Sequence, residues 1–173
     1  FEVIFNDEDS KKVNLDASKG LIKGSAVNFY GPDVTTEDVD FYYSEIKKVP
    51  NPKKPISLGL NSKLIKENGK LVEKVWKLGG MYNKEIKNII YWLSKASEVA
   101  ENEKQKEGFE LLIKYYETGD LSIWDQYNVA WVETVKGDVD YINGFIEVYN
   151  DPKGYRGSYE SVVQIKDFEM SKK

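Results

Sequence analysis

The sequence predicts an α+β fold in which a helical middle is flanked by strands. Segments near both ends alternate apolar and polar residues with a two-residue period, whereas apolar residues recur at helical spacing between about residues 82 and 131. The chain has 173 residues, among them 12 tyrosines and 4 tryptophans. This length and aromatic content predict a globular chain whose core is built largely from aromatic side chains.

The first part of the chain is expected to contain a strand, an extended segment and a helix. The stretch "FEVIF" at residues 1–5 is typical of a short strand, and a turn is expected at Gly31-Pro32. Thr35 followed by Asp38 approximates a capping box and predicts the start of a helix. The prolines of "VPNPKKP" should end this helix, and that stretch is expected to form a surface connector.

A hairpin and three helices are predicted next. Asn68-Gly69 separates two strand-like runs and supplies the two positive φ angles of a type I′ turn. Gly119 suits the end of the second helix and Asp120 the cap of the third. Aromatic stripes can form a ligand cage, but core packing is more common at this spacing. The stripes comprise Tyr82, Ile86, Ile89, Ile90 and Leu93; Phe109, Leu112, Ile113 and Tyr116; and Ile123, Trp124, Tyr127, Ala130 and Trp131.

The last third contains two predicted strands joined by a polar turn. The first is expected over residues 139–149, and its two-residue period places Glu147 and Tyr149 on one face. Glu160 lies on the following strand, which can return it close to Glu147. We therefore expect two carboxylates and a phenol to converge beside a turn.

Such a group of side chains suits a cationic ammonium, because a cation relieves the repulsion between two close carboxylates. The tyrosine hydroxyl could donate a hydrogen bond to a carbonyl that gains negative charge during reaction. A structural alternative is an exposed Glu147–Arg156 ion pair, which contributes at most about 1 kcal/mol. Paired carboxylates also occur in glycoside hydrolysis, which nothing else in the sequence supports. Residue types alone favour the structural interpretation.

Composition excludes several classes of function. The net charge is −4 and the sequence has no basic stripe, so no nucleic-acid partner is expected. No apolar run reaches the roughly 20 residues that a membrane-spanning helix needs, and no signal peptide is recognised. The sequence has no Cys and no His, which removes the commonest metal ligands and the usual general base. No metal site is therefore predicted in this chain.

The stretch "NGFIEVYNDPKGYRGSYES" resembles a segment of dipeptidyl peptidase III, the zinc-dependent exopeptidases of family M49. The pattern there is close to G-F-I-E-x-Y-x-D-P-x-G-x-R-G-x-[FY]-E. The asparagine-glycine hairpin and the helix after it are similar to the bacterial branch of the family. The matching positions are Gly144, Phe145, Ile146, Glu147, Tyr149, Asp151, Pro152, Gly154, Arg156, Gly157, Tyr159 and Glu160.

The resemblance implies a two-lobed enzyme with a small β-core and a separate helical lobe that holds zinc. Residues 1–173 would be part of the substrate-binding lobe, and the zinc-bearing lobe would lie outside this chain. Glu147 and Glu160 would hold the free amino terminus of a peptide substrate. Tyr149 would contact the scissile carbonyl and stabilise the transition state. Four positions would serve structural turns: Gly144, Pro152, Gly154 and Gly157.

We therefore expect the substrate-binding portion of a dipeptidyl peptidase, inactive as a fragment, with the missing lobe as its partner. The first residue is Phe1 rather than Met, which favours a fragment or a processed form. The alternative is a non-catalytic peptide-binding module of the same fold, and an intact carboxylate hydrolase is a third, less favoured interpretation. The expected location is the cytoplasm, with the periplasm as the alternative.

Overall fold

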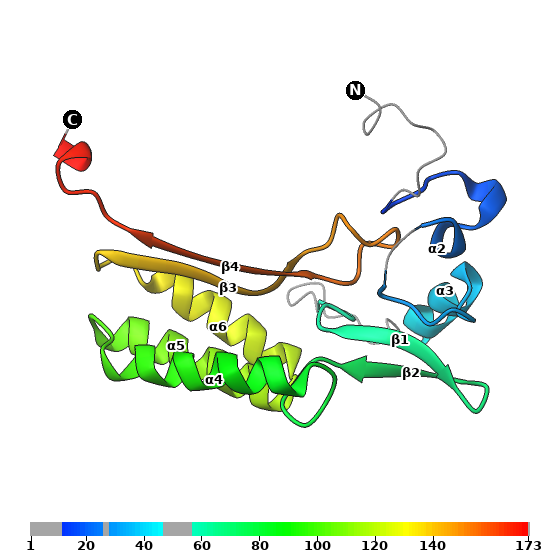
Figure 1. The fold of residues 1–173 in the computed structure, drawn as a ribbon, viewed down its shortest axis with the longest axis horizontal. Coiled ribbons are helices and arrows are strands. Elements are labelled where there is room, and N and C mark those ends of the chain that lie inside the picture. The colour runs from blue at the N-terminus through cyan, green and yellow to red at the C-terminus, as the bar shows by residue number, and fades with distance from the viewer. Residues whose placement is uncertain (1–11, 26–27, 47–56, 173) are drawn as a thin grey trace. The chain divides into compact units, whose positions relative to one another are not determined.

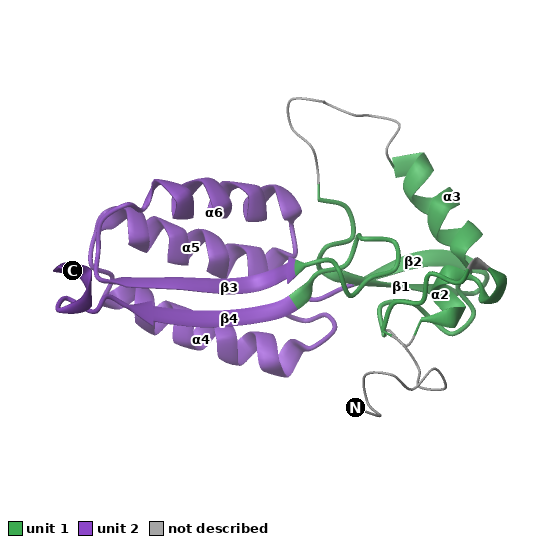
Figure 2. Ribbon diagram, turned by 90° about the horizontal axis from the view of Figure 1, so that it is seen from above, with its two compact units in different colours: residues 1–74, 147–158 green, residues 75–146, 159–173 purple. Residues whose placement is uncertain are grey.

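The structure is a computed structural model that describes residues 12–25, 28–46 and 57–172. It divides into two compact units, coloured separately in Figure 2. Unit 1 comprises residues 1–74 and 147–158, and unit 2 comprises residues 75–146 and 159–173. Helices and two small sheets confirm the predicted α+β class. The predicted strand at residues 1–5 and the proline-rich connector lie outside the described residues.

Unit 1 contains the predicted capped helix, α3 (Thr36–Ile46). The Thr35 N–H donates to the Asp38 carboxylate at 2.8 Å, and the Asp38 N–H donates to the Thr35 hydroxyl at 3.2 Å, which completes the capping box. The Val34 N–H donates to the Gly31 carbonyl at 3.1 Å and closes the predicted turn. The helical elements of this unit are η1 (Ala17–Lys19), α2 (Leu21–Gly24) and α3 (Thr36–Ile46).

The predicted hairpin of unit 1 is formed by β1 (Ser62–Glu67) and β2 (Lys70–Val75), whose last residue belongs to unit 2. Asn68 and Gly69 have φ angles of 52° and 77°, the left-handed values that a type I′ turn requires. Tyr30 forms a parallel bridge with Leu64 and so attaches the preceding segment to β1. The buried core of the unit consists of Ile22, Tyr30, Val34, Val39, Tyr43 and Leu64.

Unit 2 contains the three predicted helices. They are α4 (Asn83–Glu98), α5 (Glu103–Thr118) and α6 (Leu121–Glu133), and α5 packs against both others. Gly119 ends α5 with a φ of 72°, and the Asp120 carboxylate caps α6 by accepting from the Ser122 N–H at 2.8 Å. The stripes of α5 and α6 form the core, since Tyr116, Trp124 and Tyr127 are buried, whereas Tyr82 precedes α4 and is exposed.

The second sheet consists of β3 (Val139–Glu147) and β4 (Ser158–Ile165), and the three helices lie on one side of it (Figure 1). Tyr141 of β3 stacks on Phe109 with ring centroids 4.5 Å apart. The prediction that Gly144 serves a turn is wrong, because this residue lies inside β3. A Cβ atom there would come within 2.4 Å of the Trp124 ring, so the glycine permits close packing. A short 3₁₀ turn, η2 (Met170–Lys172), ends the described chain.

Among the described residues, no helix has both the length and the apolar character needed to cross a bilayer.

Candidate functional site

Glu147 and Tyr149 lie where β3 gives way to a turn in unit 1. β3 ends at Glu147, two residues earlier than predicted, and the Asp151 N–H donates to the Val148 carbonyl at 3.0 Å to close the turn. Strand alternation therefore does not determine on which side Tyr149 lies. Both side chains are exposed, and Tyr149 exposes 68% of its surface. The turn thus presents the phenol to solvent.

Glu160 belongs to unit 2, whereas Glu147 and Tyr149 belong to unit 1. It lies in β4 between Tyr159 and Ser161 and is half-buried. Strand alternation places Glu160 on the face opposite to those two neighbours. The convergence of the two carboxylates on one ammonium stays a prediction.

Asp151 organises the turn that follows Tyr149. Its buried carboxylate accepts hydrogen bonds from the backbone N–H groups of Lys153, Tyr155 and Arg156 at 2.8–3.0 Å. It also accepts from the Tyr30 hydroxyl, at 2.8 Å to one carboxylate oxygen. Four donors around one buried acid satisfy it fully and fix the path of the chain. The sequence predicts a polar turn here, but no local pattern indicates this role of Asp151.

Arg156 is fully buried at the other end of the same turn. Its Nη2 donates to the Tyr43 hydroxyl at 2.6 Å and lies 3.7 Å from a Glu73 carboxylate oxygen. The guanidinium carbon also lies 4.7 Å from the centre of the Tyr30 ring and 5.1 Å from that of Tyr43, which is cation–π geometry. The alternative of an exposed pair between Arg156 and Glu147 is wrong, because the guanidinium is buried against other partners.

The two phenols that contact Arg156 and Asp151 stay protonated. Burial raises the pKa of Tyr30 and that of Tyr43 well above the ordinary value for tyrosine, although the nearby Arg156 charge opposes both shifts. The Tyr43 hydroxyl donates to Glu73 while it accepts from Arg156. Tyr43 therefore connects the acid to the buried cation.

Gly59 brings the backbone of unit 1 against this cluster. Its φ is +70°, and a Cβ atom there would lie 2.4 Å from the Tyr43 hydroxyl and 2.9 Å from Arg156 Nη1. The carbonyl of the next residue, Leu60, accepts from the Gly157 N–H at 2.8 Å. Only glycine fits both the conformation and the space. No recognised sequence signal pointed to this residue.

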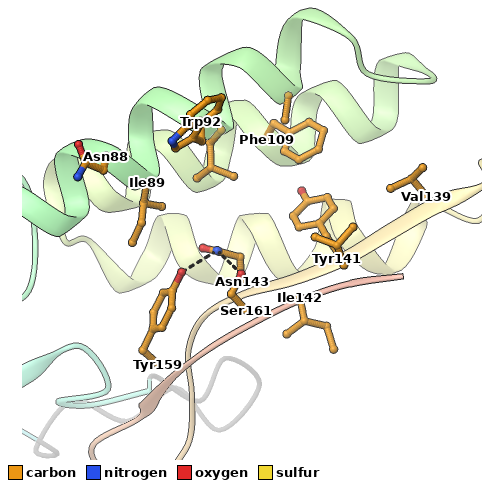
Figure 3. Close-up of a pocket in the computed structure, with 13 residues that line it drawn as sticks. Asn88, Ile89, Trp92, Phe109, Val139, Tyr141, Ile142, Asn143, Tyr159 and Ser161 are labelled. Carbon is orange, nitrogen blue, oxygen red and sulfur yellow. Dashed lines mark hydrogen bonds between the residues drawn. The ribbon is translucent and has the colours of Figure 1, made fainter. Parts of the chain in front are cut away.

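Unit 2 contains a separate cavity of about 410 Å³ between α4 and the β3–β4 sheet (Figure 3). Its lining is mainly apolar and includes Trp92 and Val163. Polar groups at its wall bond to one another: the Asn143 amide donates to the Tyr159 and Ser161 hydroxyls at 3.0 and 3.2 Å. None of the lining residues is Asp, Glu, Lys or Arg, so the lining carries no formal charge.

The part of the chain that the structure describes contains no preformed metal site. No three Asp, Glu, His or Cys side chains cluster there in a way that could hold an ion. The residues described here therefore do not fit a zinc centre.

Comparison with protein families identifies the chain. The model of peptidase family M49 matches residues 28–173. The chain belongs to this family. The predicted relationship to dipeptidyl peptidase III is thereby confirmed, while assignment to its bacterial branch stays a prediction.

Two curated relatives of this M49 chain carry the name dipeptidyl peptidase 3. That of Dictyostelium discoideum is 31% identical over 94 residues, which is 54% of this chain and 14% of the relative. That of Rattus norvegicus is 28% identical over 94 residues, 54% of this chain and 13% of the relative. The chain therefore matches only about one seventh of the length of these relatives.

Two solved structures share the fold. The DPP III of Caldithrix abyssi superposes with a TM-score of 0.65 at 22% identity and covers 84% of this chain. The dipeptidyl-peptidase III of Corallococcus sp. strain EGB gives a TM-score of 0.62 at 21% identity with the same coverage. In each case the match spans 26% of the solved chain. The M49 chain thus has the fold of one part of these proteins.

Proposed function

We propose that this chain is the part of a dipeptidyl peptidase that binds the free amino terminus of a peptide substrate. The observation that carries the proposal is the family match over residues 28–173, which contains the unbroken motif at residues 144–160. In this proposal Glu147 and Glu160 bind the substrate ammonium, and Tyr149 contacts the scissile carbonyl. Because both Glu147 and Tyr149 are exposed, a peptide can reach them.

The chemistry of each group fits its assigned role. A carboxylate accepts strong, charge-assisted hydrogen bonds from an ammonium. A tyrosine hydroxyl can donate to the carbonyl oxygen of the substrate and bind it more tightly as negative charge develops. The turn held by Asp151 and Arg156 supports this role, because it fixes the backbone from which Tyr149 projects. The amine would set where the peptide is cut.

Zinc would be bound by residues other than those described here. In a metallopeptidase, bound zinc polarises the scissile carbonyl and activates water. This chain would instead orient the peptide: anchoring the amine fixes the distance from the terminus to the reacting bond. Two residues would then be removed at a time.

The proposal is tested on the polypeptide encoded by the complete reading frame, purified with zinc. A short peptide with a free amino terminus is compared with the same peptide acetylated at that terminus, and released dipeptide is measured by mass spectrometry. We expect dipeptide from the free peptide alone. Equal cleavage of the acetylated peptide would contradict the proposal.

The reading frame itself separates the two candidate functions. An H-E-x-x-G-H motif after residue 173 supports the peptidase. A stop codon at that point would favour the non-catalytic peptide-binding module.

A further inference from the structure

The turn that carries Tyr149 is attached to unit 1 at several points. The Asn150 side-chain amide donates to the Ser158 hydroxyl at 2.9 Å and closes the base of the turn. Asp151 holds its first half through three backbone N–H groups and through Tyr30. Arg156 holds its second half through the Tyr43 hydroxyl. All these residues belong to unit 1.

Tyr149 itself is held by none of these bonds. Its ring is largely exposed, and its hydroxyl makes no hydrogen bond within the described part of the chain. The backbone alone therefore determines where this phenol lies. A fully buried residue that fixes the backbone of the turn therefore also fixes the position of the Tyr149 hydroxyl.

Burying the Arg156 guanidinium is a costly way to stabilise the fold. Two of its guanidinium nitrogens, Nε and Nη1, are buried without a hydrogen-bond partner in the described structure. Desolvating a cation is costly, and buried ion pairs are often replaced by apolar residues of similar volume without loss of stability. The pairing with Glu73 is long, at 3.7 Å. These features favour a role in geometry over a role in stability.

The geometry of Arg156 is well suited to such a role. The planar guanidinium lies close to the Tyr30 and Tyr43 rings and donates to the Tyr43 hydroxyl, and these contacts restrict its position. A Cβ atom at Gly59 would lie 2.9 Å from Nη1, so the backbone at this residue passes close to the cation. The backbone of Arg156 is simultaneously bonded to Asp151.

We propose that Arg156 is a positioning residue, whose buried guanidinium between Tyr30 and Tyr43 holds the 148–157 turn so that Tyr149 meets the scissile carbonyl. The inference rests on the proposed function, because it needs Tyr149 to act on a peptide. Arg156 does not touch the substrate. Its effect is on the rate of the chemical step rather than on peptide binding.

The test uses Arg156→Met in the zinc-containing enzyme from the complete reading frame. Methionine fills much of the space without charge or a fixed plane. Misplacing a reacting group by about 1 Å can cost on the order of 100-fold in rate, so we expect kcat to fall by about 10- to 100-fold. We expect KM to change by less than about threefold, since uniform binding is untouched. Glu73, the carboxylate left behind, is partly exposed and keeps its hydrogen bond from the Tyr43 hydroxyl, so the melting temperature should shift by only a few degrees.

Lys153→Met is the matched control. Lys153 lies on the same turn, and its side chain makes an ion pair of 2.6 Å with Asp40, more exposed than the Arg156 cluster. Removing this charge should leave kcat and KM at their wild-type values. An Arg156→Met enzyme with the kcat of the Lys153→Met enzyme would overturn the proposal.

If Arg156→Met does not fold, Tyr43→Phe tests the positioning role of Arg156 instead. It keeps the ring under the guanidinium and removes only the hydroxyl that receives its hydrogen bond. We expect a smaller fall in kcat, again without a matching rise in KM. A rise in KM alone, or no change, would overturn the proposal.

Hydrogen exchange gives a readout that does not depend on activity. In the enzyme from the complete reading frame, Arg156→Met or Tyr43→Phe should speed exchange of the Lys153 and Tyr155 N–H groups, while exchange in α5 stays unchanged. Unchanged exchange in the turn would show that Arg156 does not hold it. If the wild-type enzyme releases no dipeptide, the proposed function fails, yet this exchange experiment still reports on the turn.

Discussion

The Tyr30 hydroxyl donates a hydrogen bond of 2.8 Å to the Asp151 carboxylate, across 121 positions of sequence. This bond attaches the turn after Tyr149 to the segment beside β1. The acid also caps three backbone N–H groups, so loss of the phenol affects more than one contact. The structure of the candidate site therefore depends on residues from opposite ends of the chain.

Tyr30→Phe should destabilise unit 1. It leaves a buried carboxylate with one donor fewer, which costs about 1–3 kcal/mol in the free energy of unfolding. Urea unfolding followed by far-ultraviolet circular dichroism measures the change. Tyr91→Phe, at an exposed ring of unit 2, is the control and should have little effect. Equal stabilities for the two variants would mean that the Tyr30 bond contributes nothing.

Gly59→Ala should be more destabilising than Gly154→Ala. Both glycines have φ near +70°, so alanine is strained by about 1–2 kcal/mol at either position. Only at position 59 would the new Cβ also press on Tyr43 and Arg156, which adds about 1–3 kcal/mol. The two variants are compared by urea unfolding. If the Gly59→Ala variant is as stable as Gly154→Ala, Tyr43 and Arg156 can move away from the new Cβ atom without a measurable cost in stability.

Acid should destabilise unit 1 through Asp38. The Lys66 ammonium, 2.6 Å from the Asp38 carboxylate, and the Thr35 N–H hold the pKa of Asp38 below its ordinary value of 3.8. The Asp38 carboxylate therefore binds a proton more readily in the unfolded chain than in the folded one. The stability that Asp38 contributes is present at pH values above its ordinary pKa, and it is lost as pH falls through the lower pKa of the folded state. Unfolding free energies measured between about pH 6 and pH 2, the range over which aspartates take up protons, should show this decline. Lys66→Met should make the decline shallower, and an unchanged slope would contradict the assignment.

Glu147→Gln in the complete enzyme should weaken substrate binding more than it slows turnover. A charged hydrogen bond contributes about 1.5–3 kcal/mol, so KM should rise by about tenfold or more while kcat changes less. Steady-state kinetics on a peptide with a free amino terminus measure both constants. An unchanged KM would remove Glu147 from the proposed site.

Tyr149→Phe should instead lower turnover. The hydroxyl is expected to bond more strongly to the transition state than to the substrate, and loss of such a donor typically lowers kcat by about 100-fold or more. KM should change little. A variant with wild-type kcat would show that this phenol takes no part in the reaction.

Local sequence signals predicted much of the fold correctly. Asn68-Gly69, Gly119 and the Thr35–Asp38 pair specify a turn, a helix end and a helix start through short-range contacts alone. Periodicity likewise located the three helices of unit 2. These features could be predicted because each depends on residues that are close in sequence.

The environment of the candidate site could not be predicted in the same way. Arg156 and Tyr43 are 113 positions apart, and no local pattern announces their hydrogen bond. Residue types alone therefore favour the alternative of an exposed pair between Arg156 and Glu147. The alternation of the strand likewise continues in sequence to Tyr149, beyond the point where the Asp151 network bends the chain, so the predicted β3 is two residues too long.

The tryptophans have a distribution that is useful in the laboratory. All four, Trp76, Trp92, Trp124 and Trp131, fall within unit 2. Indole emission therefore reports on that unit alone, whereas circular dichroism senses both. If the emission curve and the dichroism curve coincide during a urea titration, the two units unfold in one cooperative transition. Two separate midpoints would mean that each unit unfolds independently.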